Sequence, residues 1–186
     1  MAAPRKDNVK ELILAATERL LETKKLSDIS LAEIARAAGV SKGTLYYHYK
    51  EKSEILFDIT DQYLTEQWND LVAWTGDASK DTSLDRLVKY VLERDVATAN
   101  MRLHLFYDAM LGNEEIRAKL VGRYRQFAGL IAAKIAERTD KLPAEYLTWL
   151  ILLLSDGLYI HNTLRDDALD VQGFIAQTAR YVKGLK

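Results

Sequence analysis

The stretch Ser30–Lys52 constrains the fold of this chain more than any other. It reads SLAEIARAAGVSKGTLYYHYKEK. Ser30 and Ser41 each precede a short helical run, where a serine hydroxyl accepts hydrogen bonds from the free amides of the first turn. Glu33, three residues after Ser30, completes a capping box, and Gly39 supplies the backbone freedom to end the first helix and turn. This order predicts a helix-turn-helix.

The second helix of the pair, about Lys42–Tyr49, presents polar and aromatic side chains instead of a second apolar face. Leu45 and Tyr49 are expected to face the core. Large aromatic groups are costly to leave in water unless a partner covers them, and hydroxyls, amides and cations are the groups that contact phosphate. We therefore expect this segment to touch nucleic acid, through Lys42, Gly43, Thr44, Tyr46, Tyr47 and His48. For Tyr46 and Tyr47 alone, capping of the small N-terminal core is an equal alternative.

Composition limits the protein classes. Hydrophobic residues make up 48% of 186 residues, which supports a packed core, and only two prolines interrupt long helical periodicities. We expect an all-α protein. Without cysteine, disulfides and thiolate metal sites are excluded. The longest strongly apolar run, Tyr146–Leu154, falls short of the roughly 20 residues that span a bilayer. We expect a cytoplasmic protein without a signal peptide or membrane segment.

The charge is unevenly distributed. Residues 1–52 hold ten Lys/Arg against seven Asp/Glu, a net charge of +3, and the remainder of the chain has a net charge of −4. A basic N-terminal segment followed by an acidic remainder fits a protein that contacts phosphate through its N-terminal segment only. Ordinary fluctuation over fifty residues explains the same numbers equally well.

Helical periodicity continues through the rest of the chain. Helices are expected at about 7–24, 51–74, 83–97, 98–111, 113–139, from 143 to beyond 160, and 170–183, with a polar loop at 76–81. The run Tyr146–Leu154 is apolar nearly all round, which indicates burial on several sides. In a small chain one side is then available for a second subunit, so the helices near 143–164 and 170–183 predict a four-helix homodimer interface. The alternative is that both helices complete the monomer core.

The helix at 98–111 carries unusual polar residues. His104 and Asp108 lie four residues apart and share a face, as a pocket with a few oriented hydrogen-bonding groups requires. The candidate ligand-binding residues are Trp74, Tyr90, Asn100, Met101, His104, Tyr107, Asp108 and His161. Alternatively, His104 and Asp108 form a satisfied buried pair or lie at the surface. A metal site from His104, Asp108 and His161 is a weaker alternative.

Enzyme signatures are absent from the sequence. It contains no G-x-S-x-G, no phosphate-binding loop and no H-E-x-x-H. We expect neither catalysis nor a cofactor.

One specific order of residues runs through Ile13–Ala16, Ser30–Ala35, Ala38–Ser41 and Lys42–Lys52, followed by Ile55 and Leu56. By this order the chain resembles the TetR family of transcriptional regulators over about its first 60 residues. It implies an all-helical protein of about nine helices. Residues 1–52 would form a three-helix DNA-binding domain, and residues 53–186 an effector-binding and dimerisation domain. A dimer would bind a palindromic operator in double-stranded DNA, and a small molecule would release it.

The resemblance also assigns roles to residues. Lys42, Gly43, Thr44 and Tyr46 match the family's groove-facing positions, while Tyr47, His48 and Lys52 match its phosphate-facing positions, and Ser30 matches a capping position that often touches phosphate. Lys42 could read guanine or bind a phosphate. Ala32 stands where some relatives carry a base-reading arginine, so base recognition would rest mostly on the second helix of the motif. An architectural or cell-division factor on the same scaffold, without an effector, is the alternative function.

Overall fold

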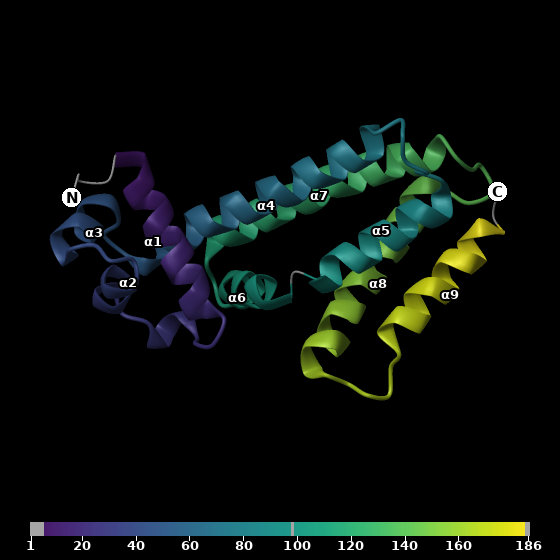
Figure 1. Cartoon of the computed structure of the whole chain (residues 1–186). Helices are drawn as coiled ribbons and strands as arrows, with labels where there is room; N and C mark the ends of the chain where they lie inside the picture. Colours follow the sequence, from purple (N-terminus) through teal and green to yellow (C-terminus); the bar gives the residue numbers. More distant parts are fainter. Residues whose placement is uncertain (1–5, 98, 185–186) are drawn as a thin grey trace. The chain divides into compact units, whose positions relative to one another are not determined.

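The computed structural model describes residues 6–97 and 99–184, without the side chains of residues 6–7 and 95–102. These described residues form nine α-helices, one short 3-10 helix and no strand, which confirms the expected all-α class (Figure 1). In chain order they are α1 Lys6–Leu21, η1 Leu26–Asp28, α2 Leu31–Ala37, α3 Lys42–His48, α4 Lys52–Gly76, α5 Leu84–Ala97, α6 Ala99–Met110, α7 Glu114–Ala136, α8 Ala144–Leu164 and α9 Val171–Lys183.

The chain folds into two compact units. Unit 1 holds the described residues up to Thr65 together with Asn100–Lys119, and unit 2 holds the remainder. The helix-turn-helix stretch and most of α6 therefore belong to the same unit, while α4 begins in unit 1 and ends in unit 2. The functional division between residues 52 and 53 stays a prediction.

Helix ends follow the signals expected from the sequence. Asn113 caps α7, because its Oδ1 accepts from the Ile116 amide at 3.1 Å. Gly112 just before it has a φ of +106°, a conformation that favours glycine. Pro143 stands at the N-cap of α8, where its missing N–H costs nothing. The 3-10 helix η1 was not expected.

The core of unit 1 is built by the first helices. α1 packs against α2, and α2 against α3 (Figure 1). Ile13, Ile34 and Leu45, one from each helix, are fully buried, as is Ile55 at the start of α4. Each such side chain contributes about 1.5–3 kcal/mol relative to exposure, so this small core holds the helix-turn-helix rigidly.

Unit 2 is built around α5. This helix packs against both α8 and α9. Its residues Leu87 and Val91 are fully buried, together with Ile151 of α8 and Ile175 of α9. α4 and α7 run side by side here, with the Trp68 and Phe127 ring centroids 5.8 Å apart (Figure 1).

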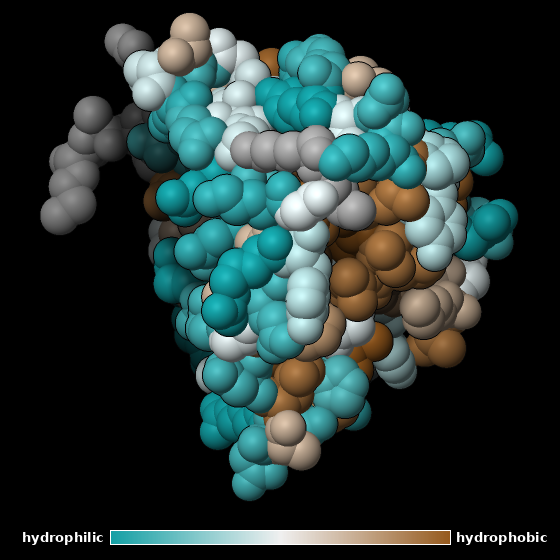
Figure 2. All heavy atoms as spheres, turned by 90° about the vertical axis from the view of Figure 1, so that its right-hand side faces the viewer, coloured by the Kyte–Doolittle hydropathy of each residue, from teal (hydrophilic) through white to brown (hydrophobic). Residues whose placement is uncertain are grey.

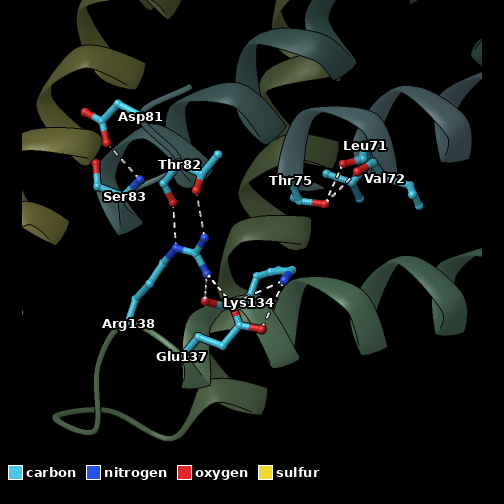
Figure 3. A network of polar contacts seen from close by, with 9 residues as sticks. All are labelled: Leu71, Val72, Thr75, Asp81, Thr82, Ser83, Lys134, Glu137 and Arg138. Atoms are coloured by element: carbon cyan, nitrogen blue, oxygen red, sulfur yellow. Dashed lines mark hydrogen bonds and ion pairs between the residues drawn. The ribbon is translucent and has the colours of Figure 1, made fainter. Parts of the chain in front are cut away.

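A polar network fastens the α4–α5 connection of unit 2 (Figure 3). Arg138, after the end of α7, donates from Nε to the Thr82 carbonyl at 2.6 Å and from a terminal nitrogen to the Thr82 hydroxyl at 2.9 Å. Next to it, the Ser83 amide donates to Asp81 Oδ1 at 3.0 Å. These bonds hold the loop that the sequence predicts at 76–81, at its exit into α5.

α8 is buried on one side and exposed on the other. Leu147, Ile151 and Leu158 lie in the core. An apolar row faces water on the opposite side: Tyr146, Trp149, Leu150, Leu153, Ile160 and Leu164. Figure 2 shows a patch of apolar side chains, bordered by hydrophilic groups, on the face of the molecule that it presents. None of the helices in the described ranges is long and apolar enough to span a bilayer.

Candidate nucleic-acid interface and ligand cavity

The first helix of the motif is capped as expected. Ser30 Oγ accepts from the Glu33 amide at 3.1 Å. The Glu33 carboxylate contacts Lys24 Nζ at 2.6 Å, so the structure shows the serine half of the expected box, with the glutamate used to tie α2 to the turn that follows α1. The hydrogen bond from the Lys24 ammonium holds the pKa of Glu33 below its ordinary value.

Gly39 makes the turn between α2 and α3. Its φ is +68°, in the left-handed region that glycine adopts without strain. The following amide, of Val40, donates to the Ala35 carbonyl at 3.0 Å and so satisfies the end of α2. The expected role of Gly39 is confirmed.

The second helix of the motif is capped by Ser41. Its Oγ accepts from the Thr44 amide at 3.0 Å and lies 2.7 Å from Thr44 Oγ1. A seven-residue helix is marginal by itself, so this cap and the buried Leu45 fix its position.

One face of α3 is open to solvent. Lys42 and Gly43 are exposed at its start, and Tyr46 and Tyr47 are 46% and 65% exposed. Neither tyrosine is buried, so capping of the core is not their role in this structure. His48 is half-buried, with its ring edge-on to Tyr47 at 5.3 Å between centroids. The face offers one cation, hydroxyls and two aromatic surfaces.

Tyr49 faces inward, as expected. It is 3% exposed, and its hydroxyl donates to Asp58 Oδ2 at 2.9 Å. Lys10 Nζ reaches the same carboxylate at 2.8 Å, which links α1 to α4. Burial raises the pKa of the Tyr49 phenol, so the group stays neutral and keeps donating.

Lys52 has internal partners that the sequence did not reveal. Its Nζ donates to the Leu26 carbonyl at 2.7 Å and to the Ser27 carbonyl at 3.2 Å. The Glu54 carboxylate accepts from the backbone amides of Lys50 and Glu51 at the start of α4. An external phosphate is therefore not needed to stabilise this helix start. An ammonium has three N–H groups, so one is left for a phosphate contact.

The predicted ligand-binding residues fall in both units. His104, Tyr107 and Asp108 line one cavity of about 520 Å³ in unit 1. The side chains of Asn100 and Met101 lie outside the described residues. His104 Nε2 lies 2.8 Å from the Leu21 carbonyl, so the expected alternative of a His104–Asp108 pair is not what the structure has.

The other candidates belong to unit 2. The Trp74 and Tyr90 rings stack, with centroids 4.4 Å apart and planes at 7°. His161 is exposed and its Nδ1 lies 2.7 Å from Asp166 Oδ2. The pKa of Asp166 is lowered by the Ala168 amide and then by His161. In the part of the chain that the structure describes, no three His, Asp or Glu side chains are grouped as a metal site would require.

Comparison with known proteins gives the family. Residues 13–59 match the family described as "Bacterial regulatory proteins, tetR family". The helix-turn-helix region of the chain is therefore of the TetR-family type.

Sequence relatives carry the names of transcriptional regulators. EthR of Mycolicibacterium smegmatis is 40% identical over 60 residues, which cover 32% of this chain and 28% of that protein. BetI of Serratia proteamaculans is 27% identical over 183 residues, covering 93% of this chain and 90% of that one. The matches to the EthR proteins thus span less than a third of those relatives and coincide with the helix-turn-helix region.

Solved structures extend the likeness to the whole fold. A regulator from Saccharomonospora viridis, in complex with choline, has a TM-score of 0.78 at 18% identity, covering 92% of this chain and 93% of that one. A TetR regulator from Haloarcula marismortui has a TM-score of 0.77 at 20% identity, covering 95% and 96%. At this identity the likeness concerns the all-helical fold alone.

Sequence reasoning missed part of the cavity in unit 1. The missed lining residues are Lys25, Leu26, Ser27, Glu51, Ser53 and Leu103. Only Lys52, a cation in the first turn of a helix, marked the region by an unusual position. The carbonyls that bind it lie 25 and 26 residues earlier in the chain, and no local pattern gives such a contact.

Proposed function

We propose that this TetR-family chain is a ligand-responsive repressor that binds double-stranded DNA as a homodimer and acts in the cytoplasm. The observation that carries the proposal is the solvent-facing side of α3. Lys42, Gly43, Tyr46 and Tyr47 are exposed together on a short helix that Ser41 and Leu45 hold in place.

The chemistry of that face suits a DNA groove. Lysine supplies charge for phosphate or a donor pair for guanine, and tyrosine and threonine hydroxyls bond to phosphate or to base edges. Gly43 has no side chain, and a Cβ built there would meet only Ser41 Oγ, at 3.8 Å. The open backbone at this position allows close approach to a base edge. Ser30 and His48 remain proposed phosphate contacts. Lys52 is a further proposed phosphate contact, through the one N–H of its ammonium that has no partner within the described chain.

Dimerisation is proposed through α8 and α9, with a second copy of the chain as the partner. The exposed row on α8 repeats at alternating intervals of about four and three residues, the spacing of a helix-packing seam, with Gly157 in the gap between Leu153 and Ile160. Phe174 and Tyr181 on α9 are exposed as well. Packing two such pairs as a four-helix bundle would cover apolar surface that a monomer leaves in water.

Two copies would carry two α3 helices related by a two-fold axis. Such a dimer reads two half-sites about one helical turn apart, so the operator is expected to be palindromic. A small molecule that prefers a conformation with a different spacing of the two α3 helices would release the DNA. Because α4 runs from unit 1 into unit 2, it is the proposed lever.

The effector-binding residues remain those proposed from the sequence. The Saccharomonospora viridis neighbour, of similar fold, was solved with choline, which supports small-molecule control in this chain without identifying the molecule. In unit 2 the stacked Trp74 and Tyr90 offer an aromatic surface, and in unit 1 the cavity beside His104 offers space.

The test is DNA binding by the full-length protein. Fluorescence anisotropy with fragments from upstream of its own gene is expected to show binding whose affinity falls steeply with salt, because phosphate contacts release counterions. A folded dimer that binds none of these fragments at low salt would end the proposal.

A further inference from the structure

The cavity of about 520 Å³ in unit 1 has a composition that selects its ligand. Three segments line it: the η1 region from Lys25 to Ser27, the start of α4 from Glu51 to Ser53, and one side of α6. Its volume falls in the range of roughly 300–1,000 Å³ that small-molecule sites occupy.

Most hydrogen-bond donors of the lining are already used inside the protein. Lys52 Nζ donates to two carbonyls, Ser53 Oγ donates to Glu51 at 3.2 Å, and Ser27 Oγ donates to Asp28 at 3.1 Å. His104 Nε2 lies 2.8 Å from the Leu21 carbonyl, and because a carbonyl only accepts, this nitrogen carries the proton. Among the described lining residues, the side-chain donors left for a ligand are the Lys25 ammonium, the Tyr107 hydroxyl and one N–H of Lys52.

Acceptors, in contrast, are left over. The Asp108 carboxylate is half-buried and forms no hydrogen bond or ion pair with any residue that the structure describes. In the neutral ring of His104, protonation of Nε2 makes Nδ1 an acceptor. A half-buried carboxylate without a partner is unfavourable, and a cationic donor would relieve the cost.

Apolar groups complete the lining. Leu103 and Tyr107, one turn apart on α6, are 50% and 57% exposed, and Leu26 is half-buried. The face of a tyrosine ring attracts a cation and also stacks on an apolar body. Lys25, an exposed cation on the rim, is the feature that an anionic ligand would use instead.

We propose that this cavity binds a small organic cation that combines an ammonium group with an apolar or aromatic body. The ammonium binds the Asp108 carboxylate, with His104 Nδ1 as a second acceptor, and the apolar body lies against Tyr107 and Leu103. The inference rests on the proposed effector control for its biological purpose, and it names the ligand class. Such a ligand would join α6 to η1 and to the start of α4, the segments that support the helix-turn-helix.

Three probes of matched size test the charge preference on the full-length protein without DNA. They are 2-phenylethylammonium, neutral 2-phenylethanol and anionic 3-phenylpropionate, each titrated to about 10 mM, enough to detect a millimolar Kd. Backbone amide NMR spectra report which residues respond. We expect saturable shifts with the cation at residues 26–27 and 103–108, and binding of the other two probes at least about tenfold weaker.

Variants separate this site from general binding. Asp108→Asn keeps the shape of the side chain and removes its charge. The variant is therefore expected to bind the cationic probe about tenfold more weakly and to bind the neutral probe with unchanged affinity. Glu11→Gln, an exposed acid on α1 outside the cavity, is the matched control and leaves both unchanged.

Several outcomes would overturn the inference. They are equal binding of all three probes, preference for the anion, an Asp108→Asn variant with normal cation affinity, shifts confined to unit 2, or no saturable shift. DNA affinity of the unliganded protein is measured in parallel. If the unliganded protein binds no DNA but the protein still binds the cationic probe, the result contradicts the proposed repressor function and supports the cation site.

Discussion

α3 and α8 both leave large apolar side chains in water, in different surroundings. On α3, Tyr46 and Tyr47 are interleaved with Lys42, Gly43 and Thr44. On α8, the exposed row from Tyr146 to Leu164 consists of aromatic and aliphatic groups only. Both surfaces are costly to a monomer, and only the first brings its own cation.

The difference indicates two kinds of partner. A mixed surface keeps its polar groups hydrated when it meets a charged, wet groove, as DNA presents. A row of apolar side chains without a cation gains most by meeting another apolar surface, as in the core of an obligate protein interface. The same quantity, exposed apolar area, thus predicts nucleic acid at one end of the sequence and a second subunit at the other.

The largest expected effect comes from Leu153→Arg. Leu153 is 64% exposed, so the monomer fold tolerates the change, while a two-fold interface receives the charge twice. We expect dimer dissociation to become at least about a hundredfold more favourable, seen as a 21.2 kDa particle by light scattering, with the helical circular dichroism unchanged.

Val121→Arg is the matched control for that prediction. Val121 is 41% exposed on α7, outside the row. It is expected to leave the dimer intact. If Leu153→Arg stays dimeric, or Val121→Arg dissociates the protein equally, the apolar row is not the interface.

The α3 surface predicts two different responses in DNA binding. Lys42→Ala should reduce the slope of log affinity against log salt by about two for a dimer, one phosphate contact per α3. Tyr47→Ala should weaken binding about tenfold with the slope retained, because the tyrosine is uncharged, and Tyr47→Phe separates the ring from the hydroxyl.

The Lys42 result also distinguishes its two possible contacts. A loss of equal size on unrelated DNA indicates a phosphate contact, whereas a loss confined to one sequence indicates guanine recognition. An unchanged affinity and slope would remove Lys42 from the interface.

Ser41→Ala tests whether the α3 surface is held in place by its cap. The serine oxygen accepts from the Thr44 amide, so we expect a loss of about 1 kcal/mol in the free energy of unfolding, measured by urea titration. Ser53→Ala is the control and should cost less, because Ser53 is exposed and, among the described residues, its hydroxyl donates to Glu51 alone. Equal losses would contradict the capping role.

The smallest effect is expected from acid. The pKa of Glu33 is lowered from 4.5 by the hydrogen bond from Lys24, so the pair contributes stability above about pH 4.5 and loses it as the pH falls through the lowered value. Lys24→Met should therefore lower the melting temperature slightly at pH 7 and not at pH 3. Lys25→Met serves as the control, because Lys25 has no carboxylate partner among the described residues.

Local signals made much of the fold predictable. Ser30, Ser41 and Asn113 act as caps, and Gly39 and Gly112 have positive φ, because each signal depends on residues within one helical turn. The inward placement of Leu45 and Tyr49 followed from helical spacing.

Contacts distant in sequence could not be predicted in the same way. His104 meets Leu21 across 83 residues, and Lys52 meets Leu26 across 26. These partners are backbone carbonyls, which every residue has, so no residue type marks them. The sequence also did not indicate that the candidate ligand-binding residues are divided between two units, because that division depends on contacts distant in sequence.

The most direct test of the central claim is the affinity of the protein for DNA from its own upstream region, measured by anisotropy across a series of salt concentrations. The account predicts two chains per site and a linear fall of log affinity with log salt that Lys42→Ala makes shallower. A folded dimer that binds no DNA, or that binds with no dependence on salt and no response to Lys42→Ala, would contradict it.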